Sequence, residues 1–532
     1  MNAAASHQTG TIARSAGTVG VAVFCSRILG LVREQVLANF FGAGLAMDAF
    51  VVAFRIPNLL RDLFAEGALS AAFVTVFTDY DQRRGGAATW RLANNVLITL
   101  TILVGGIALL GMLGSDFLVR LMAPDFGQVP GKTALTVIMT QIMFPFLPLI
   151  SLAAVVMGIL NTKGKFFVPA MASSFFNLGS ITSGVALALI LPNYGVPAII
   201  GMALGTLLGG AVQLAVQLPL LWWVGYRPQW VMGWRDEGLR RIFWLMTPAI
   251  IGLSATQINI FINTFFASSC AQGSVAWLNY AFRLLQFPIG VFGVAISVAA
   301  MPVVSRYAAQ RDLEGLKAAF TSALTMSLLI TIPASVGLAI LADPIIALIF
   351  HHGRVSAVDT PPTAGALVFY TFGLFAYAGV KVVVPVFYAL NNTKYPVMGS
   401  FLAVAANFLL VVTTLAALQH RAIALATSLS MILNFVFLSI VLYRQLQGYP
   451  LFGMLASLLK ICLAAGLMGG VVHLLAAALQ PAFQAGLISR LAALGAVMTV
   501  GALVYGSSMY VVNVPEFAVL IAQIQQRWGK KP

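Results

Sequence analysis

The sequence has 532 residues, of which 60% are hydrophobic and only 8% are charged. Its mean hydropathy of +0.94 leaves too little polar surface for a soluble protein of this length. The composition therefore predicts an all-α polytopic membrane protein and excludes a soluble enzyme. A net charge of +15 would suggest nucleic acid as the partner of a soluble chain. Here the basic residues lie in short segments between apolar stretches, which predicts membrane orientation and no nucleic-acid partner.

Apolar stretches of the roughly 20 residues that cross a bilayer recur from residue 15 to residue 512. Glycine, proline and charged residues divide them into about fourteen predicted membrane-spanning helices. These spans lie near residues 15–40, 47–78, 92–113, 133–158, 167–191, 196–224, 239–267, 274–303, 318–341, 364–390, 397–418, 422–443, 453–479 and 488–512. The first span contains Arg27, Arg33 and Glu34 and no small-residue cleavage site, so we do not expect a removable signal peptide.

The basic residues are distributed unevenly between the two sides of the predicted membrane. Eighteen of the thirty lysines and arginines fall on the side of the N-terminus and the even-numbered connections, and five fall on the opposite side. Because short loops rich in lysine and arginine stay in the cytoplasm, both termini are predicted to be cytoplasmic.

Short motifs recur at a nearly constant distance along the chain. Ala-Phe-Arg at 53–55 returns at 281–283, and Leu-Asn-Thr-Lys at 160–163 resembles Leu-Asn-Asn-Thr-Lys at 390–394, an offset near 230. Such an offset covers six helices, so the two copies share one orientation and predict two parallel lobes with a site between them. We predict an N-terminal lobe at 1–225, a C-terminal lobe at 226–445, and two further helices with a cytoplasmic tail at 446–532.

Ionisable residues within the spans are candidates for function, because a charge at the bilayer centre costs at least about 2.5–3.5 kcal/mol without a partner or a wet cavity. The basic ones are Arg27, Arg33, Arg55, Arg61, Arg283, Lys381 and Lys460, and the acidic ones are Glu34, Asp48, Asp62 and Glu66. All four acids belong to the first two spans. This clustering predicts a polar site there.

The second span carries its polar residues on one face. Arg55, Asn58, Asp62 and Glu66 follow one another at intervals of three and four residues, which stack on one side of a helix. The carboxylates of Asp62 and Glu66 either pair with arginines or contact a ligand, and both roles remain open.

Two basic residues of the second copy have no acid near them in the sequence. No carboxylate occurs between residues 239 and 303, so Arg283 favours an anionic ligand. Lys381 is a weaker candidate, because a long lysine side chain can also reach the membrane interface.

Prolines interrupt several predicted spans. Pro57, Pro288 and Pro385 each remove a backbone hydrogen bond and bend a helix. With Gly290 beside Pro288, these positions are candidate hinges, and fixed curvature is the alternative.

Motifs of enzymes and metal sites are missing from the sequence. The segment 127–133 approaches a phosphate-binding loop, but Phe126 stands where its first glycine is required. His351 and His352 have no further ligand at metal spacing. We therefore predict a transporter without a cofactor or a resident metal. Its energy would come from a coupling ion, the membrane potential or the substrate's own concentration difference.

The first two spans contain four motifs: Ser-Arg-Ile-Leu-Gly at 26–30, Met-Asp-Ala-Phe at 47–50, Ile-Pro-Asn-Leu-Leu-Arg at 56–61 and Phe-Ala-Glu-Gly-Ala at 64–68. These motifs resemble those of the MurJ (MviN) family, the lipid II flippases of the multidrug/oligosaccharidyl-lipid/polysaccharide exporter superfamily. The resemblance continues through Arg283, Pro288, Lys381 and Pro385 and covers the whole chain.

This resemblance implies a flippase of the bacterial inner membrane that carries lipid II, an undecaprenyl-diphosphate-linked disaccharide-pentapeptide, to the periplasmic leaflet by alternating access. Cavity arginines would bind the diphosphate, carboxylates would tune them, and the last two helices would hold the lipid tail. The matching arginines are Arg27, Arg33, Arg61 and Arg283, and the carboxylates are Glu34, Asp48, Asp62 and Glu66. Membrane lipids and proteins of cell-wall synthesis are the further partners that it suggests.

Two departures from the family pattern concern acids. Glu34 stands where aspartate is common, and Asp62 stands where some members carry a second arginine, so the local pairing here can differ. The alternatives are a flippase for another polyprenyl-diphosphate glycan and a cation-coupled drug exporter of the same superfamily, which would favour acids over arginines. A membrane enzyme acting on a polyprenyl phosphate would need a clustered acid site on a loop, and no such cluster is present.

Overall fold

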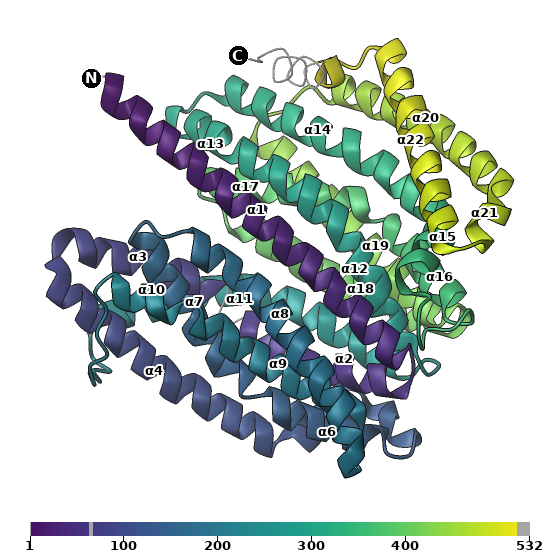
Figure 1. Ribbon diagram of the computed structural model, residues 1–532. Coiled ribbons are helices and arrows are strands. Elements are labelled where there is room, and N and C mark those ends of the chain that lie inside the picture. The colour runs from purple at the N-terminus through teal and green to yellow at the C-terminus, as the bar shows by residue number, and fades with distance from the viewer. Residues whose placement is uncertain (1, 63–66, 519–532) are drawn as a thin grey trace. The chain divides into compact units, whose positions relative to one another are not determined.

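The computed structural model describes the backbone of residues 2–62 and 67–518, and the side chains of residues 22–62 and 67–518. These residues form helices and connections without a strand (Figure 1). Among the described residues, eleven helices are long and apolar enough to cross a membrane, or twelve if the bent pair Thr360–Thr371 and Leu374–Ala389 is one span. The predicted all-helical polytopic fold is confirmed, whereas the count of fourteen spans is not. The predicted second span contains α2 and α3, of 17 and 16 residues, on either side of residues 63–66, which lie outside the described residues.

The chain forms two compact units, Met1–Ala276 and Trp277–Pro532. The helices of the first unit are α1 (Asn2–Phe41), α2 (Leu45–Arg61), α3 (Ala68–Arg83), α4 (Gly85–Leu113), α5 (Ser115–Met122), α6 (Lys132–Met143), α7 (Phe146–Thr162), α8 (Phe167–Ile190), α9 (Ala198–Ala215), α10 (Leu218–Trp223) and α11 (Glu237–Ser268). The chain passes into the second unit within the first turn of α12 (Ser274–Pro288).

The remaining helices of the second unit are α13 (Val294–Gln310), α14 (Leu313–Ile340), α15 (Ala342–Phe350), α16 (Thr360–Thr371), α17 (Leu374–Ala389), α18 (Lys394–Leu418), α19 (His420–Gln445), α20 (Leu451–Ala478), α21 (Gln480–Gln484) and α22 (Leu487–Val512). Within this unit α14 packs against α17 and α20, and α20 packs against α22. A π-helical turn, Ile289–Gly293, separates α12 from α13 directly after Pro288.

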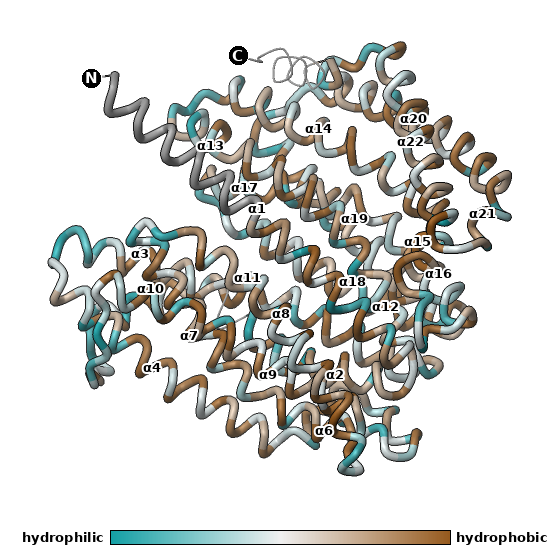
Figure 2. Tube along the Cα trace, in the orientation of Figure 1, coloured by the Kyte–Doolittle hydropathy of each residue, from teal (hydrophilic) through white to brown (hydrophobic). Residues whose placement is uncertain are grey.

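Close helix packing in the first unit depends on small residues. A Cβ atom at Gly205 of α9 would overlap the backbone of Gly184 of α8. The two backbones can approach only because both positions lack a side chain, as is common between membrane helices. Figure 2 shows hydrophobic residues along much of α4 and hydrophilic residues at the turn between α3 and α4.

The helix boundaries reproduce the repeat predicted from the sequence. Seven consecutive helices, α2 to α8, begin at residues 45, 68, 85, 115, 132, 146 and 167, and α12 to α18 begin at 274, 294, 313, 342, 360, 374 and 394. The differences lie between 226 and 229, which agrees with the offset of the motifs. By the same offset α11, which ends at residue 268, corresponds to α1, which ends at residue 41. Nevertheless α11 packs within the first unit, against α3 and α4.

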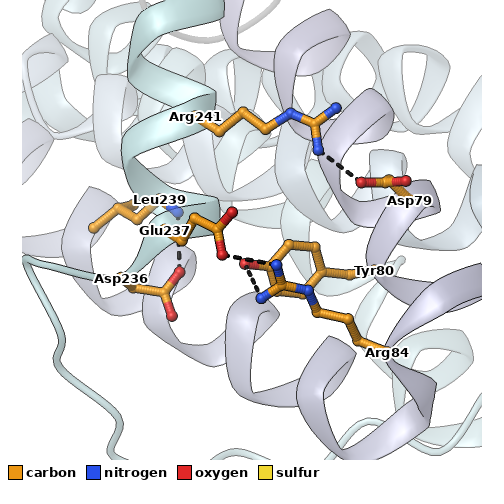
Figure 3. A network of polar contacts seen from close by, with 7 residues as sticks. All are labelled: Asp79, Tyr80, Arg84, Asp236, Glu237, Leu239 and Arg241. Carbon is orange, nitrogen blue, oxygen red and sulfur yellow. Dashed lines mark hydrogen bonds and ion pairs between the residues drawn. The ribbon is translucent and has the colours of Figure 1, made fainter.

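Charged residues join the C-terminal end of α3 to the start of α11 (Figure 3). Arg241 Nη1 donates to Asp79 Oδ2 at 2.6 Å, and Arg84 Nη2 donates to Glu237 Oε2 at 2.7 Å. Asp236 caps α11 by accepting from the Leu239 backbone N–H at 3.0 Å. The hydrogen bond from Arg241 is the main cause that lowers the pKa of Asp79. The hydrogen bond between Arg84 and Glu237 is the main cause that raises the pKa of Arg84.

Asp79→Asn is expected to lower the thermal stability of the protein between pH 5 and 8. Because folding lowers the pKa of Asp79, this carboxylate stabilises the folded protein above its unfolded-state pKa of about 3.9. The stabilisation is lost as the pH falls through the lower pKa of the folded state. The difference in unfolding midpoint between parent and variant, measured in detergent from pH 3 to 8, should therefore shrink below about pH 4. Asp116→Asn is the control, since its partner among the described side chains is Arg120 of its own helix. A difference that is unchanged at pH 3 would contradict the assignment.

Candidate functional site

The first buried charge of the predicted site is Arg33 on α1. Arg33 is 7% exposed and Glu34 is 4% exposed. Arg33 Nη2 lies 3.3 Å from Glu34 Oε1. The guanidinium lies over the rings of Phe54 and Phe176, with its Cζ atom 5.7 and 5.2 Å from their centroids. Aromatic faces and a carboxylate together stabilise a cation away from water. Arg27, two turns earlier on α1, is exposed.

Polar residues of α2 meet α11 at two places. Arg55 Nη1 donates to Thr264 Oγ1 at 2.7 Å, and Gln257 Nε2 donates to Asp62 Oδ2 at 3.3 Å. Asn58 lies one turn before Asp62, and its Oδ1 atom is buried without a hydrogen-bond partner in the described ranges. The shared face predicted for α2 is thus turned toward α11 at Arg55 and Asp62. Glu66, the last residue predicted for this face, lies outside the described residues.

Arg61 and Asp62 form an ion pair at the end of α2. Arg61 donates from Nε and Nη2 to Asp62 Oδ1 at 3.1 and 2.8 Å. The two side chains are 22% and 30% exposed, so the pair is only partly buried. Of the two roles that the sequence left open for Asp62, the structure therefore supplies the pairing. The double contact fixes the plane of the Arg61 guanidinium.

Asp48, at the start of α2, is the acceptor of a buried network that the sequence did not predict. Its residue is 1% exposed, and Oδ2 accepts from Lys132 Nζ at 2.9 Å and from the Gly273 N–H at 2.8 Å. Oδ1 accepts from the Ala276 N–H at 3.0 Å, so Asp48 satisfies free N–H groups at the start of α12. The carboxylate therefore stabilises the point where the chain leaves the first unit.

Lys132 was placed in a loop by the sequence, but the structure buries it at 3% exposure. Its Nζ atom also lies 4.0 Å from the centroid of the Phe126 ring. Lysine at the edge of an apolar stretch is the usual pattern of a loop or of a side chain that reaches the interface. The sequence did not single out Gln257 and Thr264 either, because a neutral polar residue in an apolar stretch is not unusual in the way that a charged residue is.

The second unit contains Arg283 on α12 and Lys381 on α17. Lys381 is exposed, and its carbonyl oxygen accepts a hydrogen bond from Ser297 Oγ at 2.6 Å. Pro288 precedes the π-helical turn that includes Gly290. Pro385 lies inside α17, as Pro57 lies inside α2. Hinge motion at these positions stays a prediction.

Comparison with known proteins identifies the family. The family model described as lipid II flippase MurJ matches residues 37–493. The chain belongs to the MurJ family. A probable lipid II flippase MurJ of Vibrio cholerae is 37% identical over 441 residues, which cover 81% of this chain and 82% of that protein. The lipid II flippase MurJ of Burkholderia cenocepacia is 32% identical over 468 residues, with 86% and 88% covered.

Solved structures agree with the MurJ assignment. The structure titled lipid II flippase MurJ, inward closed conformation, superposes with a TM-score of 0.76 at 26% identity, covering 93% of this chain and 98% of that one. An inward-facing MATE family transporter of the MOP superfamily shares the fold, with a TM-score of 0.65 at 19% identity, covering 79% and 95%. The predicted family and the prediction of a transporter rather than an enzyme are confirmed. Membership of the MurJ family and the many apolar helices indicate a multi-pass protein of the bacterial inner membrane.

Proposed function

We propose that this chain moves lipid II from the cytoplasmic to the periplasmic leaflet by alternating access, and that Arg27, Arg33, Arg61 and Arg283 bind its diphosphate. The observation that carries the proposal is the burial of Arg33 among apolar helices of a MurJ family member. An arginine in that environment costs several kcal/mol and is retained where it has a function. The carboxylates Glu34, Asp62 and Glu66 orient these cations and reduce their net charge, whereas the carboxylate of Asp48, also predicted for this role, is paired with Lys132.

Arginine suits this substrate for a chemical reason. A diphosphate bearing sugars and a peptide cannot cross hydrocarbon unless other donors replace its water shell, and a guanidinium presents paired N–H donors that match phosphate oxygens. At Arg61 the hydrogen bonds to Asp62 hold the guanidinium in place, while the side chain stays 22% exposed. Arg55, Asn58 and Lys381 are secondary candidates for contacts to the headgroup.

The lipid tail can stay in contact with the bilayer or with the last two long helices. On α20, leucines with exposed side chains recur every four residues and so form one apolar stripe; they are Leu455, Leu459, Leu463 and Leu467. This stripe supports the proposal that α20 and α22 hold the tail. Both termini would face the cytoplasm, and a coupling ion or the membrane potential would supply the energy.

The test is the appearance of lipid II on the periplasmic face of cells whose only flippase is this chain. Alanine at Arg27, Arg33, Arg61 or Arg283 is expected to reduce that appearance at least tenfold while membrane insertion, measured by protein level in the membrane fraction, stays unchanged. Alanine at the exposed Arg120, which pairs with Asp116 on α5, is the control and should leave transport unchanged. If depletion of the protein left lipid II reaching the periplasmic face at its normal rate, the proposed function would be wrong.

A further inference from the structure

The helix α11 is aligned residue by residue with α2 and α3. From Arg55 to Asp62 the chain advances seven residues, and their partners, Thr264 and Gln257, are also seven residues apart in the opposite direction. The ion pair of Asp79 with Arg241 continues this antiparallel order toward the end of α3. Polar contacts therefore fix the register of α11 against α2 and α3 within the first unit.

Gln257 is the residue of α11 that touches the predicted phosphate site. Its Nε2 atom donates to Asp62 Oδ2, while Arg61 occupies Oδ1 with two hydrogen bonds. Each carboxylate oxygen thus has its own donor. Without Gln257, the Asp62 carboxylate could rotate so that Oδ2 accepts from other donors. The orientation of the Arg61 guanidinium would then be less well fixed. Gln257 acts on Arg61 through Asp62 and is a positioning residue.

The other end of the Gln257 amide has no partner. Gln257 is 8% exposed, and its Oε1 atom is buried and accepts no hydrogen bond within the described ranges. The Oδ1 atom of Asn58, one turn from Asp62 on the facing helix, is in the same state. An unpaired buried acceptor is unfavourable, so two of them beside one ion pair point to a ligand that brings donors.

We propose that Gln257 holds Asp62, and through it Arg61, in the orientation that binds a phosphate, and that its Oε1 accepts a hydrogen bond from the same ligand. Asn58 accepts a second one. The ligand class is a glycosyl diphosphate, whose phosphate oxygens accept from arginine while its sugar hydroxyl or amide N–H groups donate to Gln257 and Asn58. This inference rests on the proposed function and adds to it a helix, α11, that the charged residues did not indicate.

The test uses the full chain in detergent, with affinity measured for lipid II and for undecaprenyl diphosphate, which lacks the sugars and the peptide. Gln257→Leu is expected to bind lipid II roughly tenfold more weakly, since a hydrogen bond to a charged group and one to the ligand are lost. The loss for undecaprenyl diphosphate should be smaller. Thermal stability should change little, because leucine removes the unpaired Oε1 atom and water can replace the lost donor at Asp62, whose side chain is 30% exposed.

Gln257→Glu separates positioning from packing. A glutamate beside Asp62 repels it when ionised but donates to it when protonated, so the affinity of this variant relative to the parent should rise as the pH falls from 8 to 5.5. Gln217→Leu is the matched control: Gln217 is also buried with an unpaired Oε1, but its amide donates to the Gln213 carbonyl. It should bind lipid II as the parent does.

The outcomes are distinguishable. If the parent protein does not bind lipid II, the proposed function fails. If the parent binds it and Gln257→Leu binds equally well, or if Gln217→Leu loses as much affinity as Gln257→Leu, the role of Gln257 is refuted. If Gln257→Leu lost equal affinity for lipid II and for undecaprenyl diphosphate, Gln257 would form no hydrogen bond with the sugar or peptide. If the affinity of Gln257→Glu relative to the parent did not change with pH, Gln257 would not act through Asp62.

Discussion

Lys132→Met is expected to lower the free energy of unfolding by about 3–5 kcal/mol, because it leaves a buried carboxylate without its counter-charge. The side chains of Lys132 and Asp48 are 4% and 1% exposed, so water cannot replace the lost partner. The two backbone N–H donors that remain, from Gly273 and Ala276, compensate only part of the charge. The measurement is denaturant unfolding in detergent micelles.

A double-mutant cycle distinguishes the ion pair from general packing. Asp48→Asn alone should also destabilise the protein, because it leaves a buried ammonium group without its counter-charge. The double variant Asp48→Asn/Lys132→Met should lose less stability than the sum of the two single losses. Lys163→Met is the control: Lys163 Nζ lies 2.6 Å from Asp81 Oδ1, but both side chains are about a quarter exposed, and we expect a loss of about 0–1 kcal/mol. Equal losses for Lys132→Met and Lys163→Met would show that burial does not strengthen the first pair.

The sequence predicted those residues of the site whose burial in a membrane is energetically unfavourable. Arg33 and Glu34 stand out because charges inside an apolar stretch are unfavourable. The contact of Asp48 with Lys132 joins residues 84 positions apart, and no periodicity relates them. Gln257 and Thr264 are neutral, so only their hydrogen bonds to Asp62 and Arg55 indicate that they belong to the site.

The fold was predictable where the sequence repeats itself. Two short motif matches gave an offset that the starts of seven helix pairs reproduce within three residues. The number of spans was not predictable in the same way, because only eleven or twelve helical segments among the described residues are long and apolar enough to cross a membrane, against fourteen predicted. Likewise α11 is the counterpart of α1 in the repeat but packs within the first unit. Sequence similarity between repeats indicates equivalent helices and does not determine which neighbours they pack against.

Arg33→Lys is expected to reduce lipid II transport at least tenfold although the positive charge is kept. The guanidinium of Arg33 is planar and lies over two aromatic rings, Phe54 and Phe176, beside Glu34. An ammonium group is more strongly hydrated, cannot stack and offers no paired donors to a phosphate. A hydrogen bond to a charged group contributes about 1.5–3 kcal/mol, so the loss of one of the paired donors to the phosphate exceeds the roughly 1.4 kcal/mol that corresponds to a factor of ten.

The matched control for Arg33→Lys is Arg84→Lys. Arg84 also lies over an aromatic ring, 4.5 Å from the Tyr80 centroid, and also pairs with a carboxylate, that of Glu237. Its side chain is 47% exposed, so lysine there keeps its hydration and transport should stay near the parental rate. Both variants are compared by the rate at which lipid II becomes accessible in proteoliposomes, with protein content and thermal midpoint measured in parallel. Normal transport by Arg33→Lys would mean that charge alone is required at this position, and the argument from the planar guanidinium would then fail for the phosphate contact as well.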